Sequence, residues 1–230
     1  MNSKLKIKFA FAVNLIKNGN VKQVWKAFVR RIAYEQPAYG FKRDLSLEYA
    51  KPRSLTSVTI REFQPGDEVY FKERQNDGQI NEFRTCYVAV TKEGIPCFHL
   101  WLIDASQNEK LKKVWGDIFP RLNPDEFLVE NVYTVPKFRG AGIFPAVLHE
   151  IAEKSKALGA KYLISFGETN NVNMSRSFAY AGFFPYVLRT KKNFLFNRTI
   201  FFEDIPDELM SDYNGYTAAF RAKPKKKEEV

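Results

Sequence analysis

The sequence predicts an α+β protein, and two observations support that fold class. Runs rich in β-branched and aromatic residues recur along the chain and indicate strands; they cover 57–62, 83–90, 95–103, 126–135, 161–166, 183–190 and 194–202. Between them, residues 143–158 and 171–181 carry apolar side chains at helical spacing, and Gly159 and Gly182 end these two helices. The chain therefore combines a sheet with a small number of helices.

Composition favours one domain with appendages. The chain has 230 residues, of which 45% are hydrophobic and 15% aromatic, enough to bury one core. The net charge of +10 belongs to the two ends, because residues 1–53 carry 12 Lys/Arg against 3 Asp/Glu and residues 221–230 carry 5 against 2. Residues 54–220 are slightly acidic, with 19 against 21. The body of the protein is therefore not expected to bind nucleic acid.

The N-terminal 53 residues are predicted to form a basic helical extension and a linker. Residues 4–16 and 21–32 place apolar side chains on one helical stripe and lysines or arginines around it. Residues 34–52 are polar, aromatic and flanked by proline, and we expect a linker there that wraps the domain or lines an acceptor pocket. Three uses of the helices stay open: packing on the domain, contact with a membrane surface through residues 4–32, and contact with another subunit, as in a homodimer.

The number of cysteines and the length of the apolar runs indicate where in the cell the protein is expected. Cys86 and Cys97 are too few for a disulfide framework, and no Cys/His cluster has metal-ligand spacing, so we expect core thiols and no metal site. The apolar run 9–13 is interrupted by Asn14 and lacks a small-residue cleavage site, and no run approaches the roughly 20 apolar residues of a membrane span. The expected location is the cytoplasm, either free or at the inner face of the membrane.

The elements before residue 130 follow in order. Residues 57–62 alternate as a first strand, and residues 64–67 begin a short helix. The strands 83–90 and 95–103 are joined by a turn that ends at Gly94, which predicts a hairpin. Residues 104–124 have a helical centre around Trp115 and lead into the strand 126–135.

Residues 131–145 are the stretch around which the chemistry is expected. The strand stops at Pro136, the run Arg-Gly-Ala-Gly at 139–142 turns tightly, and a helix follows with Pro145 in its first turn. Backbone N–H groups around a small-residue turn at a helix N-terminus form a partly positive concavity. The stretch therefore predicts a site for a phosphate or diphosphate.

The stretch Thr-Val-Pro-Lys-Phe-Arg-Gly-Ala-Gly-Ile at 134–143 resembles the acyl-CoA signature of the GNAT acetyltransferase superfamily. Arg139 and Gly142 match that signature, whereas Phe144 stands where glycine or alanine is usual. A second segment is similar to the family at Asn171, Gly182 and Phe183, but Phe178 occupies the position of the usual tyrosine. The resemblance covers about residues 54–205 and implies a GNAT domain with a mixed, mostly antiparallel sheet flanked by helices. Residues 206–230 are then a C-terminal extension and basic tail.

The resemblance also implies a cosubstrate and the residues that hold it. The cosubstrate is acetyl-CoA or another acyl-CoA, with its diphosphate in the turn and its arm along the preceding strand. Carried onto this sequence, the cofactor-binding residues are Val132, Tyr133, Thr134, Arg139, Gly140, Ala141, Gly142, Ile143, Phe144 and Asn171.

Acyl transfer needs a base, and three residues are candidates. Glu130 lies on the strand before the turn, Glu168 lies just past the end of the strand 161–166, and His99 lies within the strand 95–103. The loss of a hydroxyl at Phe178 predicts a modest penalty, because a thiol is already fairly acidic and can leave without help.

Three functions remain open from sequence. The first is an acyl-CoA-dependent N-acyltransferase acting on a small amine such as an amino sugar nucleotide, because the segment from Arg43 to Leu45 is similar to one found in GNAT proteins of bacterial surface-polysaccharide biosynthesis. The second is a membrane-associated transferase with a lipid-linked or protein acceptor. The third is a non-catalytic CoA-binding module of the same family.

Overall fold

The structure is a computed structural model that describes residues 33–71, 83, 85–194 and 197–224. The two predicted basic helices at 4–16 and 21–32 and the end of the basic tail at 225–230 lie outside the described residues.

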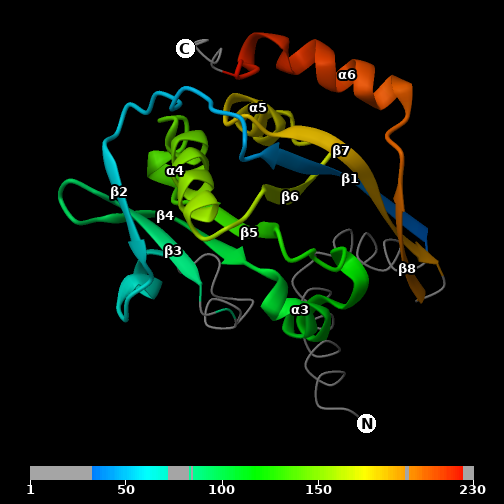
Figure 1. The fold of residues 1–230 in the computed structure, drawn as a ribbon, viewed down its shortest axis with the longest axis horizontal. Coiled ribbons are helices and arrows are strands. Elements are labelled where there is room, and N and C mark those ends of the chain that lie inside the picture. Colours follow the sequence, from blue (N-terminus) through cyan, green and yellow to red (C-terminus); the bar gives the residue numbers. More distant parts are fainter. Residues whose placement is uncertain (1–32, 72–82, 84, 195–196, 225–230) are drawn as a thin grey trace, which may run out of the picture.

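In the described part of the chain, eight strands form one sheet in the order β2-β3-β4-β5-β6-β1-β7-β8 (Figure 1). Every neighbouring pair there is antiparallel except β5 with β6, which is parallel, so the expected mixed and mostly antiparallel sheet is confirmed. The strands are β1 (Ala33–Asp44), β2 (Val58–Glu62), β3 (Cys86–Thr91), β4 (Pro96–Ile103), β5 (Glu126–Thr134), β6 (Tyr162–Glu168), β7 (Phe184–Phe194) and β8 (Asn197–Glu203).

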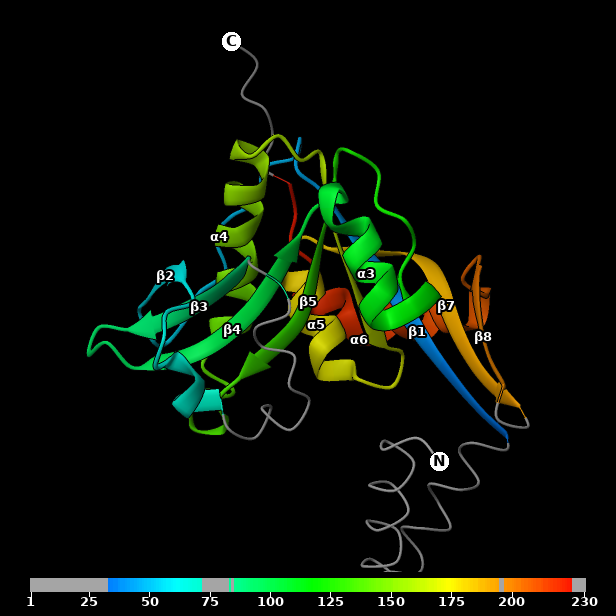
Figure 2. The same ribbon diagram turned by 90° about the horizontal axis from the view of Figure 1, so that it is seen from below.

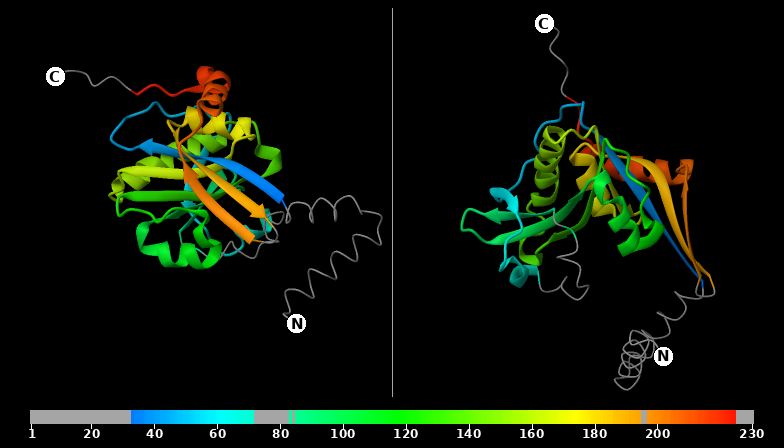
Figure 3. Two further views of the ribbon diagram at one scale, coloured as in Figure 1. Left: turned by 90° about the vertical axis from the view of Figure 1, so that its right-hand side faces the viewer. Right: turned by 60° about the horizontal axis from the view of Figure 1, so that its bottom comes forward.

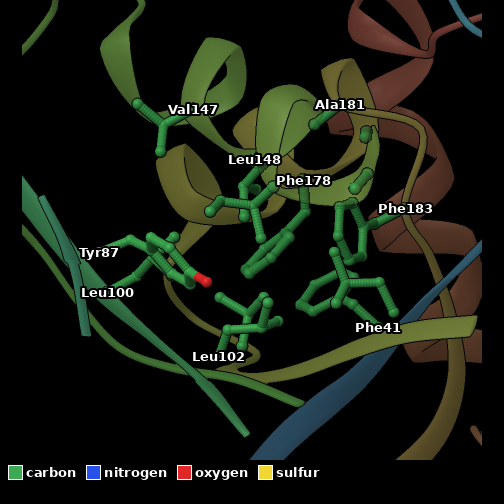
Figure 4. Close-up of a cluster of buried hydrophobic side chains, with 14 of the residues drawn as sticks. Phe41, Tyr87, Leu100, Leu102, Val147, Leu148, Phe178, Ala181 and Phe183 are labelled. Atoms are coloured by element: carbon green, nitrogen blue, oxygen red, sulfur yellow. The ribbon is translucent and has the colours of Figure 1, made fainter. Parts of the chain in front are cut away.

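The helices cover both faces of the sheet. α4 (Ile143–Ala157), α5 (Val172–Tyr180) and α6 (Asp207–Thr217) lie on one face, and α3 (Asn108–Trp115) lies on the other (Figures 1 and 2). Each face has its own hydrophobic core. On the α4 side, Phe41, Phe178 and Phe183 converge between the helices and the sheet (Figure 4), and Phe41 stacks on Phe178 with ring centroids 4.6 Å apart.

The expected linker at 34–52 is wrong in its first part, because residues 33–44 form the strand β1. β1 lies inside the sheet and pairs with β6 on one side and with β7 on the other. Gly40 shows why the segment is hard to recognise from its sequence: a Cβ there would lie 2.6 Å from Val187 Cγ1 and 2.8 Å from Phe166 Cε1. A residue that usually weakens a strand is required here by its neighbours.

α6 was expected only as part of an unspecified C-terminal extension. Gly215 lies inside the helix and lowers its helical propensity, but the helix is held by contacts with distant residues. Tyr213 is buried with 1% of its surface exposed, and the hydroxyl of Tyr39 donates a hydrogen bond of 2.9 Å to the carbonyl of Leu209. Tertiary packing therefore stabilises this helix more than its own propensity does.

Two findings bear on the remaining expectations. Within residues 33–224, apart from the gaps named above, none of the helices combines the length and the apolar character that crossing a bilayer requires. In the same residues, no three side chains among His, Cys, Asp and Glu come together in a way that could hold a metal ion. Cys86 and Cys97 are free and buried, as expected for core thiols.

Candidate functional site

The strands β5 and β6 pair only at their beginnings. Residues 126–128 pair with residues 162–164, and beyond that point the two strands no longer pair with each other. β5 also contains a bulge, because Asn131 and Val132 together lie opposite Leu100 of β4, and Asn131 has a φ of +50°. A bulge interrupts a ladder and bends the strand. The sheet is therefore open along one edge of β5.

A cleft of about 840 Å³ occupies this opening, a volume typical of small-molecule sites. Its walls come from β5, the turn after it, the start of α4, the second half of β6 and α5. The lining residues include Glu130, Val132, Tyr133, Thr134, Arg139, Gly140, Gly142, Ile143, Phe144, Phe166, Asn171, Arg176, Phe178 and Tyr180. Of the ten predicted cofactor-binding residues, all but Ala141 line the cleft.

The backbone of β5 presents polar groups to the cleft in alternation. The N–H of Val135 donates 2.9 Å to the carbonyl of Cys97 on β4. Alternation along an antiparallel strand then turns the N–H of Tyr133 toward β4 as well, and turns the N–H and carbonyl of Thr134 toward the cleft. The Nε of Arg139 donates 3.1 Å to that carbonyl of Thr134, which agrees with this assignment. The side chain of Arg139 thus lies along the open edge of β5.

The turn after β5 has the conformation that its glycines predict. Gly140 and Gly142 have φ values of +78° and +74°, and Gly142 is the N-cap of α4 without any side-chain cap. Within the described residues, the N–H groups of residues 140–144 donate to no protein acceptor, since the first helical bond of α4 starts at Ala146. Arg139 and Gly140 are exposed. The positive end of a 15-residue helix is therefore open to an anion.

A segment before β2 supports this turn from behind. The hydroxyl of Ser54 and the N–H of Leu55 both donate to the carbonyl of Ala141, at 3.0 and 2.8 Å. A Cβ on Gly142 would lie only 2.6 Å from the carbonyl oxygen of Arg53. Ala141 therefore serves the turn through its carbonyl, and sequence reasoning did not identify the supporting residues because they are nearly 90 positions away.

α5 contributes the opposite wall. The side chain of Asn171 accepts a hydrogen bond of 3.1 Å from the N–H of Met174, so it caps the helix that lines the cleft. The two departures from the GNAT pattern touch each other, because the rings of Phe144 and Phe178 are 5.3 Å apart and nearly perpendicular. Tyr180, expected on another face of the helix from Phe178, also lines the cleft, and its hydroxyl accepts a hydrogen bond of 3.3 Å from the N–H of Arg53.

The three candidate bases lie in different surroundings. Glu130 is half-buried and lines the cleft. Glu168 is exposed at the end of β6 and accepts a hydrogen bond from Gln36, but it does not line the cleft. His99 is 1% exposed, packs against the rings of Phe71 and Tyr133 at 4.7 and 5.8 Å, and does not itself line the cleft. The structure therefore brings Glu130 to the cleft and leaves Glu168 and His99 outside it.

Two arginines near the cleft were missed by sequence reasoning. Arg176 lines the cleft, and its Nε donates 3.0 Å to the carbonyl of Tyr216. Arg189 lies over the ring of Phe166, a cleft residue, at 5.0 Å, and its charge interacts with Glu130. Neither position follows from a sequence signal, because β7 and α6 meet these elements only in the folded protein.

No protein-family model and no curated protein sequence matches the chain. Similar solved structures include the GCN5-related N-acetyltransferase from Sphaerobacter thermophilus, at 14% identity and a TM-score of 0.48 over 75% of this chain and 56% of that one. A glucosamine N-acetyltransferase region of a fungal multi-domain GH3 β-N-acetylglucosaminidase has 13% identity and a TM-score of 0.49 over 78% and 23%. A Drosophila protein has 11% identity and a TM-score of 0.50 over 75% and 55%.

These likenesses concern the arrangement of helices and strands. The chain spans less than two thirds of the length of each of these three chains. The element order, the mixed sheet and the opening between β5 and β6 define an α+β protein, and this is the arrangement that the resemblance at 134–143 and 171–183 implies.

Proposed function

We propose that the protein transfers an acyl group from an acyl-CoA, with acetyl-CoA the first choice, to a small amine. One observation carries the proposal: the unbonded N–H groups at the start of α4 and the unpaired edge of β5 meet in a single cleft. The end of the cleft at the start of α4 suits a diphosphate. The end along β5 offers main-chain groups that can hydrogen-bond an extended polar arm.

This geometry supports a proposal for the residues that hold the cosubstrate. The N–H groups of residues 140 and 142–144 bind the diphosphate, and Arg139 and Arg176 add positive charge along the same walls. The backbone of Val132 and Thr134 takes up the arm along β5. Bound acyl-CoA supplies an acyl group activated as a thioester.

Glu130 is the proposed base. It lies on the same strand edge as the arm-binding backbone and lines the cleft, so it can reach the amine directly or through one water. The main-chain N–H of Thr134 faces the cleft and can stabilise negative charge on the reacting carbonyl oxygen. Tyr180 places a hydroxyl in the cleft wall. We propose that this hydroxyl donates the proton to the leaving thiolate, which Phe178 cannot do.

An amino sugar nucleotide is the proposed acceptor class within the amines. The resemblance that suggests this acceptor includes Arg43. Arg43 also has a structural role, because it is 1% exposed and its Nη1 donates a hydrogen bond of 2.8 Å to the carbonyl of Ala181. A role in surface-polysaccharide synthesis is therefore part of this proposal and rests on that resemblance alone. The membrane-associated alternative depends on residues 4–32, which lie outside the described residues.

Calorimetry and a thiol-release assay test the proposal together. Acetyl-CoA should bind, and at least one member of a panel of amino sugars, amino sugar nucleotides, polyamines and peptides should release free CoA. Glu130→Gln should lower kcat at least about 100-fold while acetyl-CoA affinity changes less than about threefold, because the base acts on the acceptor. The matched control is Glu168→Gln, which should lower kcat far less. Binding of acetyl-CoA without turnover of any amine would instead support the non-catalytic module.

A further inference from the structure

Beyond the cleft, the α3 side of the sheet carries a row of charged and aromatic residues. The register sets Ala38 of β1 opposite both Glu168 of β6 and Arg189 of β7, and sets Arg189 opposite Phe202 of β8. Residues paired directly across strands point to the same face of a sheet. The row Glu168, Ala38, Arg189 and Phe202 therefore shares one face.

The next row on this face adds a second cation. Lys191 follows Arg189 by two positions on β7, so its side chain points to the same side, and it pairs with Gln36 of β1. The Nε2 of Gln36 donates a hydrogen bond to Glu168, which ties the two rows together. Figure 3 shows β1, β7 and β8 running side by side. Arg189 contacts the ring of Phe166, which lines the cleft, so the two rows lie next to the cleft.

Arg189 is held in place but not neutralised by a close partner. Its Nη1 donates 3.2 Å to the carbonyl of Ile118, and its guanidinium lies over the rings of Phe166 and Phe119 at 5.0 and 5.7 Å. Its Nε is buried without a hydrogen-bond partner among the described residues. No carboxylate of those residues forms a close ion pair with Arg189 or Lys191.

The local charges leave positive potential on this surface. Burial lowers the pKa of Lys191, and the neighbouring charges of Arg198 and Arg189 lower it further, against the opposing effect of Glu168. Burial also lowers the pKa of Arg189, while Glu130 and Glu168 act in the opposite direction. Two carboxylates thus stand beside three cations. A bound anion would relieve the repulsion among the cations.

We propose that Arg189 and Lys191 bind an anionic group of the acceptor, a phosphate or a carboxylate, while the amine of the same molecule faces Glu130. The inference rests on the proposed function and narrows its substrate class to amines that carry an acid group. A guanidinium and an ammonium side by side suit both phosphate and carboxylate oxygens. Polyamines, which carry only positive charge, meet repulsion from the same pair and are excluded as good acceptors.

Matched acceptor pairs test the inference. Initial rates are measured for glucosamine against glucosamine 6-phosphate, for an α-amino acid against its amide, for an amino sugar nucleotide, and for spermidine. The acid-bearing member of the preferred pair should have a kcat/KM at least about tenfold higher, the effect of one charge-assisted contact. Preference within the sugar pair identifies phosphate as the recognised group, and preference within the amino-acid pair identifies carboxylate.

Two variants separate binding from folding. Lys191→Gln should raise KM for the anionic acceptor about tenfold and leave kcat within about twofold, and Arg189→Gln should do at least as much if its melting temperature stays near that of the parent protein. The control is Lys192→Gln, the adjacent residue of β7 on the opposite face, where Lys192 pairs with Glu35 at 3.3 Å; it should change neither constant. Each variant is also tested with the neutral member of the pair, where Lys191→Gln should have no effect.

The outcomes distinguish failure of the proposed anion recognition from failure of the proposed acyltransferase function. Equal use of the acid-bearing and neutral amines, or the same KM for Lys191→Gln and Lys192→Gln, overturns the inference while the acyltransferase function stands. If acetyl-CoA binds and no amine of either kind is acylated, the proposed function fails and the inference falls with it.

Discussion

Gly142 is the position where backbone conformation, packing and the proposed diphosphate site meet. Its φ of +74° lies in the left-handed region, where an alanine costs about 1–2 kcal/mol. A Cβ at this position would also lie 2.6 Å from the carbonyl oxygen of Arg53, closer than the 3.0 Å that real Cβ contacts respect. Since that oxygen belongs to the backbone, the contact is relieved only by moving the chain, at about 1–3 kcal/mol. We therefore expect Gly142→Ala to lower the free energy of unfolding by about 2–5 kcal/mol.

Gly159 provides a matched control at the other end of the same helix. Its φ is +93°, and nothing lies within 4 Å of a Cβ built there. Gly159→Ala therefore pays the conformational cost alone, about 1–2 kcal/mol. Urea denaturation measures both free energies, and the difference between the two variants isolates the contact with Arg53.

The same pair of variants reports on the cleft. Movement of the turn in Gly142→Ala should weaken acetyl-CoA binding at least about tenfold in calorimetry, because the N–H groups of residues 140 and 142–144 no longer converge. Gly159→Ala should bind as the parent protein does. Equal losses of stability in the two variants, or parent-like affinity in Gly142→Ala, would refute the role assigned to the turn.

Three further predictions concern the turn, the inserted strand and the thiols. Arg139→Ala should weaken acetyl-CoA binding about three- to tenfold by calorimetry, and Lys137→Ala, outside the cleft walls, should not; equal effects would point to general charge instead. Gly40→Val should lower the free energy of unfolding by about 1–3 kcal/mol in urea, whereas a surface linker would tolerate it. Burial raises the pKa of Cys86 to about 12 and of Cys97 to about 11. Both stay protonated at pH 8, so a thiol reagent should label them only in denaturant, and fast labelling of the native protein would contradict their burial.

Several features were predictable from sequence because short-range physics fixes them. The turn at 139–142 needs positive φ at two positions, and glycine is the residue that adopts it without a steric penalty. Asn171 caps α5 through its own side chain, and Gly159 and Gly182 end α4 and α5 in the left-handed conformation. Periodic apolar residues located these helices and all seven predicted strands to within a few residues, since the period reports which face is buried.

The remaining features depend on contacts between residues that are far apart in the chain. The sequence predicts a linker where β1 lies, because Gly40 and Pro37 weaken the local strand signal, and only Val187 and Phe166 explain the glycine. α6 forms because distant residues cover Tyr213. No local sequence pattern predicts that β1 inserts between β6 and β7.

The candidate site likewise combines features set by local sequence with features set by tertiary contacts. The sequence by itself determined the small-residue turn, the helix that starts from it and the identity of Glu130 as a strand carboxylate next to that turn. The tertiary structure decided which side chains share the cleft: it separated β5 from β6, placed Tyr180 and Arg176 in the wall, left His99 in the core and brought Arg189 beside Phe166. Backbone conformation depends on neighbours in the chain, whereas proximity across a sheet depends on strand order and register, which no short segment encodes.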